Sequence, residues 1–161
     1  MTPDETIRIR PYHPGDRDQV MALAPRLTEG VARWRDPADV LAAVEDWIRR
    51  SIDGAGQPGH AAFVAVIGDT VAGVITLGER THFTGQVDAY VGELVVRPEM
   101  QRRGVATELM TAAETWAAGR GLAFVTLHTG AANASARAFY AALGFEEEDV
   151  GLAKAIQPAA R

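Results

Sequence analysis

Hydrophobic and polar positions change their spacing twice in the first third of the chain. Residues 7–10 (Ile-Arg-Ile-Arg) alternate with period two, which predicts a short strand with one buried face. Asp16 is suited to cap a helix whose apolar stripe is Val20, Leu23, Ala24 and Leu27. Asp36 and Pro37 fit the start of a second helix, whose apolar face would hold Val40, Leu41, Val44, Trp47 and Ile48.

Three runs of strand-forming residues follow. Residues 61–67 and 70–77 are apolar and are separated only by Gly68-Asp69, a connection typical of a tight hairpin. Residues 90–96 are rich in β-branched, aromatic and aliphatic side chains, and Pro98 ends this run because proline cannot donate to a strand ladder. The first half therefore predicts a strand, two helices and three strands.

The second half begins with a helical pattern, whose buried residues would be Val105, Leu109, Ala112, Ala113 and Trp116. Residues 122–127 are nearly all apolar, as expected for a strand covered on both faces, and a strand-helix-strand unit of this length implies a parallel pair with a right-handed crossover. Asn133 can cap a last helix that stops at Gly144 and buries Ala136, Phe139, Tyr140 and Leu143. Residues 150–156 predict a final short strand.

Composition narrows the class of protein. A chain of 161 residues predicts one domain over residues 1–161, with a single substantial core. Its net charge of -5 argues against a general nucleic-acid binder and slightly favours cationic partners. Cysteine is absent, which excludes disulfides, a thiol nucleophile and a cysteine-ligated metal. Acidic residues at the N-terminus do not suit a secretory signal, and no apolar run approaches the ~20 residues of a membrane span, so we expect a cytoplasmic protein with no membrane partner.

The connection between the run at 90–96 and the next helix has the chemistry of a phosphate site. Gly104 and Ala106 are small enough for the backbone to curl with its N–H groups outward, and the helix adds the positive end of its dipole. Arg102 and Arg103 lie beside this turn and suit a doubly charged phosphate group. The alternative is an ordinary strand-to-helix connection with solvated arginines. No G-x-G-x-x-G follows the first strand, and the P-loop pattern G-x-x-x-x-G-K-[ST] is absent from the chain.

Two motifs carry a resemblance to a known family. Gln101, Gly104 and Ala106 match the pattern Gln/Arg-x-x-Gly-x-Gly/Ala. The second block is Asn133-x-x-Ala136-x-x-Phe139-Tyr140-x-x-x-Gly144-Phe145. With both motifs in this order, the chain resembles the GCN5-related N-acetyltransferase (GNAT) superfamily over roughly its whole length.

The resemblance implies an α/β fold with a mixed central sheet of six or seven strands, flanked by about four helices. It also implies acetyl-coenzyme A (acetyl-CoA) as co-substrate, bound where two strands splay apart, and no metal. The pantetheine arm would pair with the backbone of Leu94, Val95 and Val96, and Asn133 and Tyr140 would also serve the cofactor. The pyrophosphate would rest on the backbone of Arg102, Arg103, Gly104, Val105, Ala106 and Thr107. Gln101, directly before them, would also bind the cofactor.

Acetylation of an amine needs a proton acceptor, because an alkyl amine of pKa ~10.4 is mostly protonated at neutral pH. Glu93 is the carboxylate best placed to accept this proton, directly or through water. Alternatively, Glu93 is a strand glutamate that simply faces solvent or pairs with an arginine. A backbone N–H near Val96 would meet the developing oxyanion. The resemblance implies that Tyr140 donates a proton to the leaving sulfur. Alternatively, Tyr140 is only an aromatic side chain on the buried face of its helix.

Acceptor recognition is the least determined part of the prediction. Glu29, Trp34 and His128 are candidate substrate contacts, and His128 is also an alternative base or a strand-end histidine with an ordinary partner. The loops at 28–34 and 80–86 would select the acceptor but carry no recognisable pattern. We expect an N-acetyltransferase that acts on a primary amine, either a small cationic amine or a protein amino group, in a ternary complex. Transfer of another acyl group, a non-catalytic acyl-CoA-binding module and a homodimer are left open.

Overall fold

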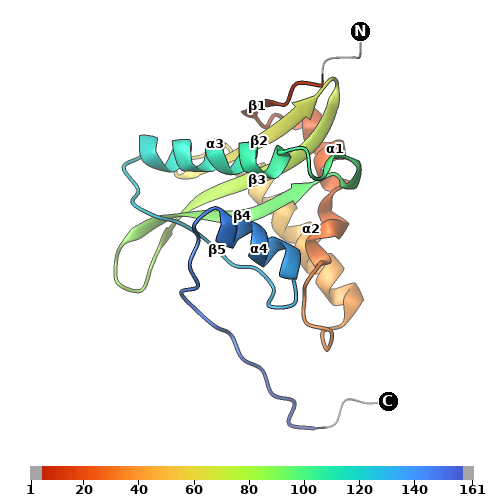
Figure 1. The fold of residues 1–161 in the computed structure, drawn as a ribbon, viewed down its shortest axis with the longest axis vertical. Helices are drawn as coiled ribbons and strands as arrows, with labels where there is room; N and C mark the ends of the chain where they lie inside the picture. The colour runs from red at the N-terminus through yellow and green to blue at the C-terminus, as the bar shows by residue number, and fades with distance from the viewer. Residues whose placement is uncertain (1–4, 158–161) are drawn as a thin grey trace.

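A mixed sheet forms the centre of the computed structural model, which describes residues 5–157 (Figure 1). Within these residues the sheet has five strands in the order β1-β2-β3-β4-β5, and every neighbouring pair is antiparallel except β4 and β5, which are parallel. The strands are β1 (Arg8–Pro11), β2 (His60–Ile67), β3 (Thr70–Thr81), β4 (Val87–Val96) and β5 (Val125–Leu127). The order places β4 between an antiparallel and a parallel neighbour.

Helices cover both faces of the sheet. The short helices α1 (Arg17–Met21) and η2 (Ala24–Thr28) pack with α2 (Pro37–Asp53) on one face, and α3 (Val105–Gly119) and α4 (Ala134–Ala142) lie on the other (Figure 1). Two further 3-10 turns are η1 (Pro14–Asp16) and η3 (Pro98–Met100). The parallel pair β4 and β5 is joined through α3, as the sequence predicts.

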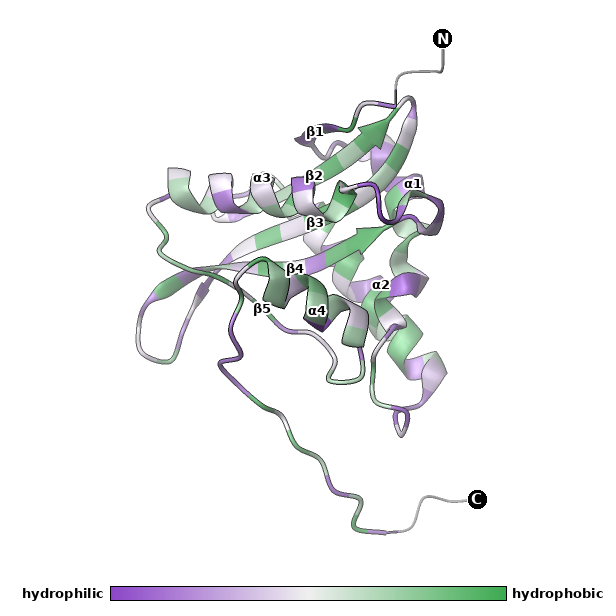
Figure 2. Cartoon of the chain, in the orientation of Figure 1, coloured by the Kyte–Doolittle hydropathy of each residue, from purple (hydrophilic) through white to green (hydrophobic). Residues whose placement is uncertain are grey.

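Each face of the sheet has its own apolar core. Val20, Ile48 and Val74 belong to the cluster on the α1–α2 side, whereas Ile75 and Leu109 belong to the cluster on the α3–α4 side. Apolar residues are accordingly concentrated along β2 and β3, as the hydropathy colouring shows (Figure 2). These two strands are buried on both faces and hold β4 rigidly in place.

Several expected elements are confirmed. The two residues Gly68-Asp69 join β2 to β3, because Ile67 pairs with Thr70 and Gly68 takes a φ of 59°. The Asp36 carboxylate caps α2 by accepting the Asp39 N–H at 3.0 Å, and the Asn133 side chain caps α4 in the same way.

The first helix differs from the prediction. Helix α1 ends at Met21, and Pro25 lies in a separate 3-10 turn. Asp16 is buried but its side chain does not cap α1; it binds the Arg10 guanidinium at 2.7 and 2.8 Å. A cap was expected because short acidic side chains favour that position. Instead, the Asp16 carboxylate binds Arg10 on β1.

The expected six or seven strands are wrong for the described residues, which form five. Residues 150–156 were expected to form a strand but have no regular structure, and the segment runs away from the body of the protein (Figure 1). Leu152 is 93% exposed. The four carboxylates at 146–149 favour solvation over docking, and the glycine and alanines after them have low strand propensity.

Two other burial predictions are also wrong. Strand β5 contains only three residues and is not covered on both faces: its members are half-buried, and the preceding Phe124 is 59% exposed. On α2 the buried residues are Val44, Ile48 and Ile52, whereas Trp47 is 54% exposed. The buried stripe of α2 is therefore narrower than the apolar pattern, and Trp47 is free to line a surface pocket.

Candidate active site

A bulge in β4 positions the candidate base. Ile75 pairs with Leu94 and Leu77 pairs with Val91, so the single residue Thr76 on β3 lies opposite both Gly92 and Glu93. The Glu93 N–H donates to the Thr76 hydroxyl oxygen at 3.0 Å, and that hydroxyl donates to the Glu93 carboxylate. Thr76 therefore holds both the backbone and the side chain of Glu93.

Gly92 completes this arrangement by leaving room for Thr76. A Cβ atom at Gly92 would lie 2.9 Å from the Thr76 hydroxyl oxygen, closer than such contacts occur. Glu93 is only 6% exposed, yet it lines a surface pocket and pairs with no arginine among the described residues. Glu93 is therefore neither a solvated strand glutamate nor one paired with an arginine of the described residues.

Strand β4 loses its β5 neighbour beyond the bulge. The parallel pairing covers only Ala89 to Val91, so Leu94, Val95 and Val96 pair with β3 alone. The Arg97 N–H donates to a carbonyl on the β3 side, and because N–H directions alternate along a strand, those of Leu94 and Val96 point to the open side. This open edge of β4 is where an extended polar chain can add as a strand would.

The pocket beside the bulge has a volume of about 610 Å³. Its walls come from several elements: Trp47 and Ser51 on α2, Arg80 on β3, Tyr90 on β4 and His128 after β5. Glu93 and Thr76 line it from the sheet. We call this cavity the β4 pocket. The β4 pocket is large enough for a small metabolite, and the Glu93 carboxylate of the bulge faces it.

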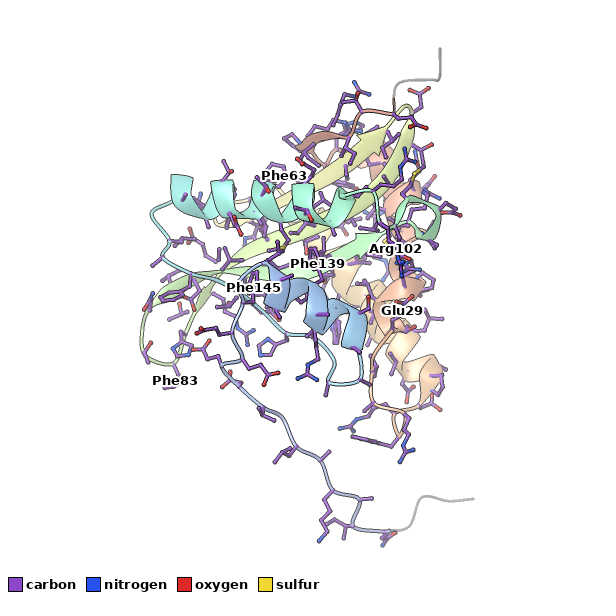
Figure 3. The ribbon with its side chains drawn as sticks, in the orientation of Figure 1. Glu29, Phe63, Phe83, Arg102, Phe139 and Phe145 are labelled. Atoms are coloured by element: carbon purple, nitrogen blue, oxygen red, sulfur yellow. The ribbon has the colours of Figure 1, made fainter. Side chains whose placement is uncertain are left out.

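The turn after β4 has the form of an anion site. Arg102 and Gly104 take positive φ angles of 60° and 84°, and α3 begins directly after them. Within the described residues, the N–H groups of residues 102–107 donate to no hydrogen bond. Figure 3 labels Arg102 in the right half of the view, above Glu29. A curled backbone with free N–H groups at a helix N-terminus fits a pyrophosphate.

Tyr140 lies on the opposite face of the sheet from the β4 pocket. Its ring packs edge-on against Phe139 and Phe145, at centroid distances of 5.2 and 5.5 Å, in the apolar cluster on the α3–α4 side of the sheet. Figure 3 labels Phe139 and Phe145. Burial raises the pKa of the Tyr140 phenol to about 12. Its hydroxyl makes no hydrogen bond to any described residue, so the proton is available to a bound group. The geometry is that of a neutral donor held by aromatic packing.

The first turn of α4 contacts a loop from the other side of the molecule. Asn133 caps α4 and its amide nitrogen lies 3.5 Å from the Glu29 carbonyl oxygen. The two loops cross at Gly30 and Gly130, where a Cβ atom on Gly130 would lie 2.0 Å from the Gly30 carbonyl oxygen. Only glycine permits this close approach. The sequence gives no local signal for it, because the two glycines are far apart in the chain.

The structure separates the candidate acceptor contacts. His128 lines the β4 pocket and its Nδ1 lies 3.1 Å from the Tyr90 hydroxyl. Trp34 is 62% exposed and lines a different groove, of about 450 Å³, along α2. Glu29 pairs with Arg26 at 3.3 Å and lines neither cavity. Of the three, only His128 shares a cavity with Glu93.

Among the residues of this pocket that sequence reasoning did not single out are Thr76, Arg80 and Tyr90. No local pattern could have found Thr76, because its role depends on the register between β3 and β4. Tyr90 and Arg80 were visible only as a strand aromatic and a turn arginine.

Comparison with known proteins decides the family. A model of the GNAT acetyltransferase family matches residues 24–145. The chain belongs to this family. Among curated GNAT-type proteins, an uncharacterized N-acetyltransferase of Methanocaldococcus jannaschii is 40% identical over 62 residues. That match spans 38% of this chain and 27% of the relative's length.

Solved structures agree on the fold. A GCN5-related N-acetyltransferase from Ralstonia eutropha is 24% identical with a TM-score of 0.72, covering 94% of this chain and 99% of that one. The aminoglycoside N-acetyltransferase AAC(6′)-Iy, solved in complex with CoA, is 21% identical with a TM-score of 0.68, covering 94% and 96%. The GNAT fold therefore extends over nearly the whole chain. No helix in the described part of the chain is long and apolar enough to cross a membrane.

Proposed function

We propose that this protein is an N-acetyltransferase that moves an acetyl group from acetyl-CoA to the primary amine of a small molecule, in a ternary complex. The observation that carries the proposal is the position of Glu93. Its carboxylate lines the β4 pocket at a bulge, and directly beyond that bulge the edge of β4 is free of β5. A proton acceptor thus lies beside the place where an extended thioester chain can pair.

Different residues of the chain would hold different parts of acetyl-CoA. The free N–H groups of residues 102–107, with Arg102 and Arg103, would hold the pyrophosphate, and the open edge of β4 at residues 94–96 would hold the pantetheine arm. Gln101 precedes this turn, and Asn133 shapes the first turn of α4. Acetyl-CoA supplies the activated acetyl group when bound.

Glu93 would accept the proton of the incoming ammonium, directly or through water, and a backbone N–H near Val96 would donate to the carbonyl oxygen as negative charge develops there. Tyr140 would protonate the departing thiolate. His128 remains the alternative base, since it lines the same pocket. Each role uses a group that the described residues leave free or only partly engaged.

The test is an assay of free thiol release from acetyl-CoA with a panel of primary amines. Wild-type protein should release thiol with at least one amine, and Glu93→Gln should lower turnover by about tenfold to a thousandfold with little change in CoA affinity. Glu99→Gln is a matched control, because Glu99 is an exposed glutamate of η3 outside the β4 pocket. An unchanged turnover in Glu93→Gln would move the role of base to His128 or water.

Two alternatives have distinct outcomes in the same assay. Faster thiol release from propionyl-CoA or a longer acyl-CoA would indicate transfer of another acyl group. CoA binding without thiol release from any amine would indicate a non-catalytic acyl-CoA-binding module. The single domain over residues 1–161, a protein amino group as acceptor, a homodimer and a cytoplasmic location stay predictions.

A further inference from the structure

The charged side chains around the β4 pocket are unevenly paired. Glu79 binds Arg120 at 2.6 Å, and Arg50 binds Asp46 at 2.6 Å. Two charged groups lining the pocket have no partner of opposite charge among the described residues: the Arg80 guanidinium and the Glu93 carboxylate. The pocket therefore presents one free cation and one free anion to an occupant.

Arg80 is held in place although it is exposed. Its guanidinium carbon lies 4.6 Å from the centre of the Tyr90 ring, and the Tyr90 hydroxyl is hydrogen-bonded to His128. Such stacking fixes the direction of the guanidinium and leaves its N–H groups free to donate to an anion. Arg80 is thus pre-oriented beside the pocket.

The two free charges lie at different points along β4. Arg80 sits over Tyr90, and Glu93 is three residues further along the same strand; because the bulge takes up one of these residues, the two positions are two strand steps apart, roughly 7 Å at ~3.3 Å per step. An occupant touching both would hold an anionic group at one end and an ammonium group at the other, separated by a short chain.

From this arrangement we infer that the acceptor is a small amine that also carries an anionic group, a carboxylate or a phosphate, which Arg80 binds while the amine faces Glu93. The inference rests on the proposed acetyl transfer and specifies its substrate class. It replaces the small cationic amine that the net charge of the chain favours. An acceptor with several ammonium groups would place like charge beside Arg80.

The experiment compares matched amines at fixed acetyl-CoA. 4-Aminobutyrate and n-butylamine differ by the carboxylate, 1,4-diaminobutane replaces it with a second ammonium, and 3-aminopropylphosphonate replaces it with a phosphate analogue. Wild-type kcat/KM should be about tenfold or more higher for one of the two anionic amines than for n-butylamine. Which of them is better distinguishes a carboxylate from a phosphate acceptor. Equal or better use of n-butylamine or the diamine would overturn the inference and leave the proposed acetyl transfer standing.

Variants assign the preference to a residue. Arg80→Gln should bring kcat/KM for the anionic amine to within about threefold of that for n-butylamine, mainly by raising KM for the anionic amine. Arg80→Lys should show a preference between those of wild type and Arg80→Gln. Arg49→Gln removes the same charge on α2 outside the pocket lining and should keep the wild-type preference. An unchanged preference in Arg80→Gln would overturn the role of Arg80.

Binding keeps the inference testable if no amine yields thiol, the outcome that defeats the proposed function. Calorimetric titration of the CoA-bound protein with 4-aminobutyrate and with 3-aminopropylphosphonate should then show binding to wild type that Arg80→Gln weakens by about tenfold or more. Binding of neither compound, or equal binding to both proteins, would overturn the inference as well.

Discussion

The hydroxyl of Thr76 bonds twice to Glu93: its oxygen accepts the Glu93 N–H at 3.0 Å, and it donates its proton to the Glu93 carboxylate. Thr76 lies on β3 and is only 2% exposed. The orientation of the candidate base is therefore set by a residue on the neighbouring strand.

Thr76→Val tests this relationship, because it keeps the shape of the side chain and removes the hydroxyl. It should lower turnover by about tenfold and cost about 1–3 kcal/mol of unfolding free energy, since it leaves a buried N–H unpaired. Thr76→Ser retains the hydroxyl and should keep most of the activity. Steady-state kinetics with denaturant unfolding would check both, and equal turnover in the two variants would contradict the positioning role.

Gly104→Val should weaken CoA binding by well over tenfold, which is more than ~1.4 kcal/mol. Gly104 has a φ of 84°, a conformation that β-branched residues avoid, so the variant would distort the turn whose free N–H groups form the anion site. Gly121→Val is the matched control, because Gly121 has a φ of 70° and lies beyond the other end of α3. Calorimetric titration with CoA should show near wild-type affinity for the control only. Unchanged affinity in a folded Gly104→Val would contradict the site.

Tyr140→Phe should lower turnover by about one to three orders of magnitude while CoA affinity barely changes. The ring and its aromatic contacts remain, and the lost hydroxyl has no partner in the described residues, so stability at neutral pH should change little. The loss of rate should shrink above the thiol pKa of ~8.5, where free thiolate is a stable product. A pH–rate profile of both proteins is the measurement, and a variant that melts early and loses CoA would instead make Tyr140 structural.

The raised pKa of Tyr140 also predicts alkaline behaviour. The phenol ionises near pH ~10 in the unfolded chain and at about 12 in the folded protein. Folding therefore favours the protonated form. The stability that this shift contributes is complete below pH ~10 and is lost as the pH rises to about 12, with a total of roughly 3 kcal/mol. Denaturant unfolding at pH 9 and pH 11 should show a smaller loss of stability in Tyr140→Phe than in wild type, and an equal loss would contradict the shift.

Asp16→Asn should destabilise the fold by about 1–3 kcal/mol, because Asp16 is buried and binds Arg10 through both oxygens. The hydrogen bond from Arg10 lowers the pKa of Asp16, so this stability is present above the unfolded pKa of ~3.9 and is lost as the pH falls through the folded pKa. Asp53→Asn breaks the exposed pair with Arg17 and should have little effect. Acid unfolding monitored by circular dichroism would compare the two, and similar midpoints would contradict the prediction.

The sequence by itself determined most of the elements and the family motifs. The Gly68-Asp69 hairpin, the Asp36 and Asn133 caps and the small-residue turn at Gly104 are local features, and each follows from the conformational preferences of a few adjacent residues. These preferences do not depend on distant parts of the chain. For that reason the order of strands and helices, and the turn proposed to bind phosphate, are both readable without a structure.

Only the tertiary structure decided which side chains share a cavity. The bonds of Thr76 to Glu93, the stacking of Arg80 on Tyr90 and the exposure of Trp47 depend on strand register and on how α2 lies against the sheet. Asp16 binds Arg10 on β1 in place of capping its own helix, and the strand expected at 150–156 does not form. A sequence pattern records what a residue favours locally, and packing decides which of the available partners it meets.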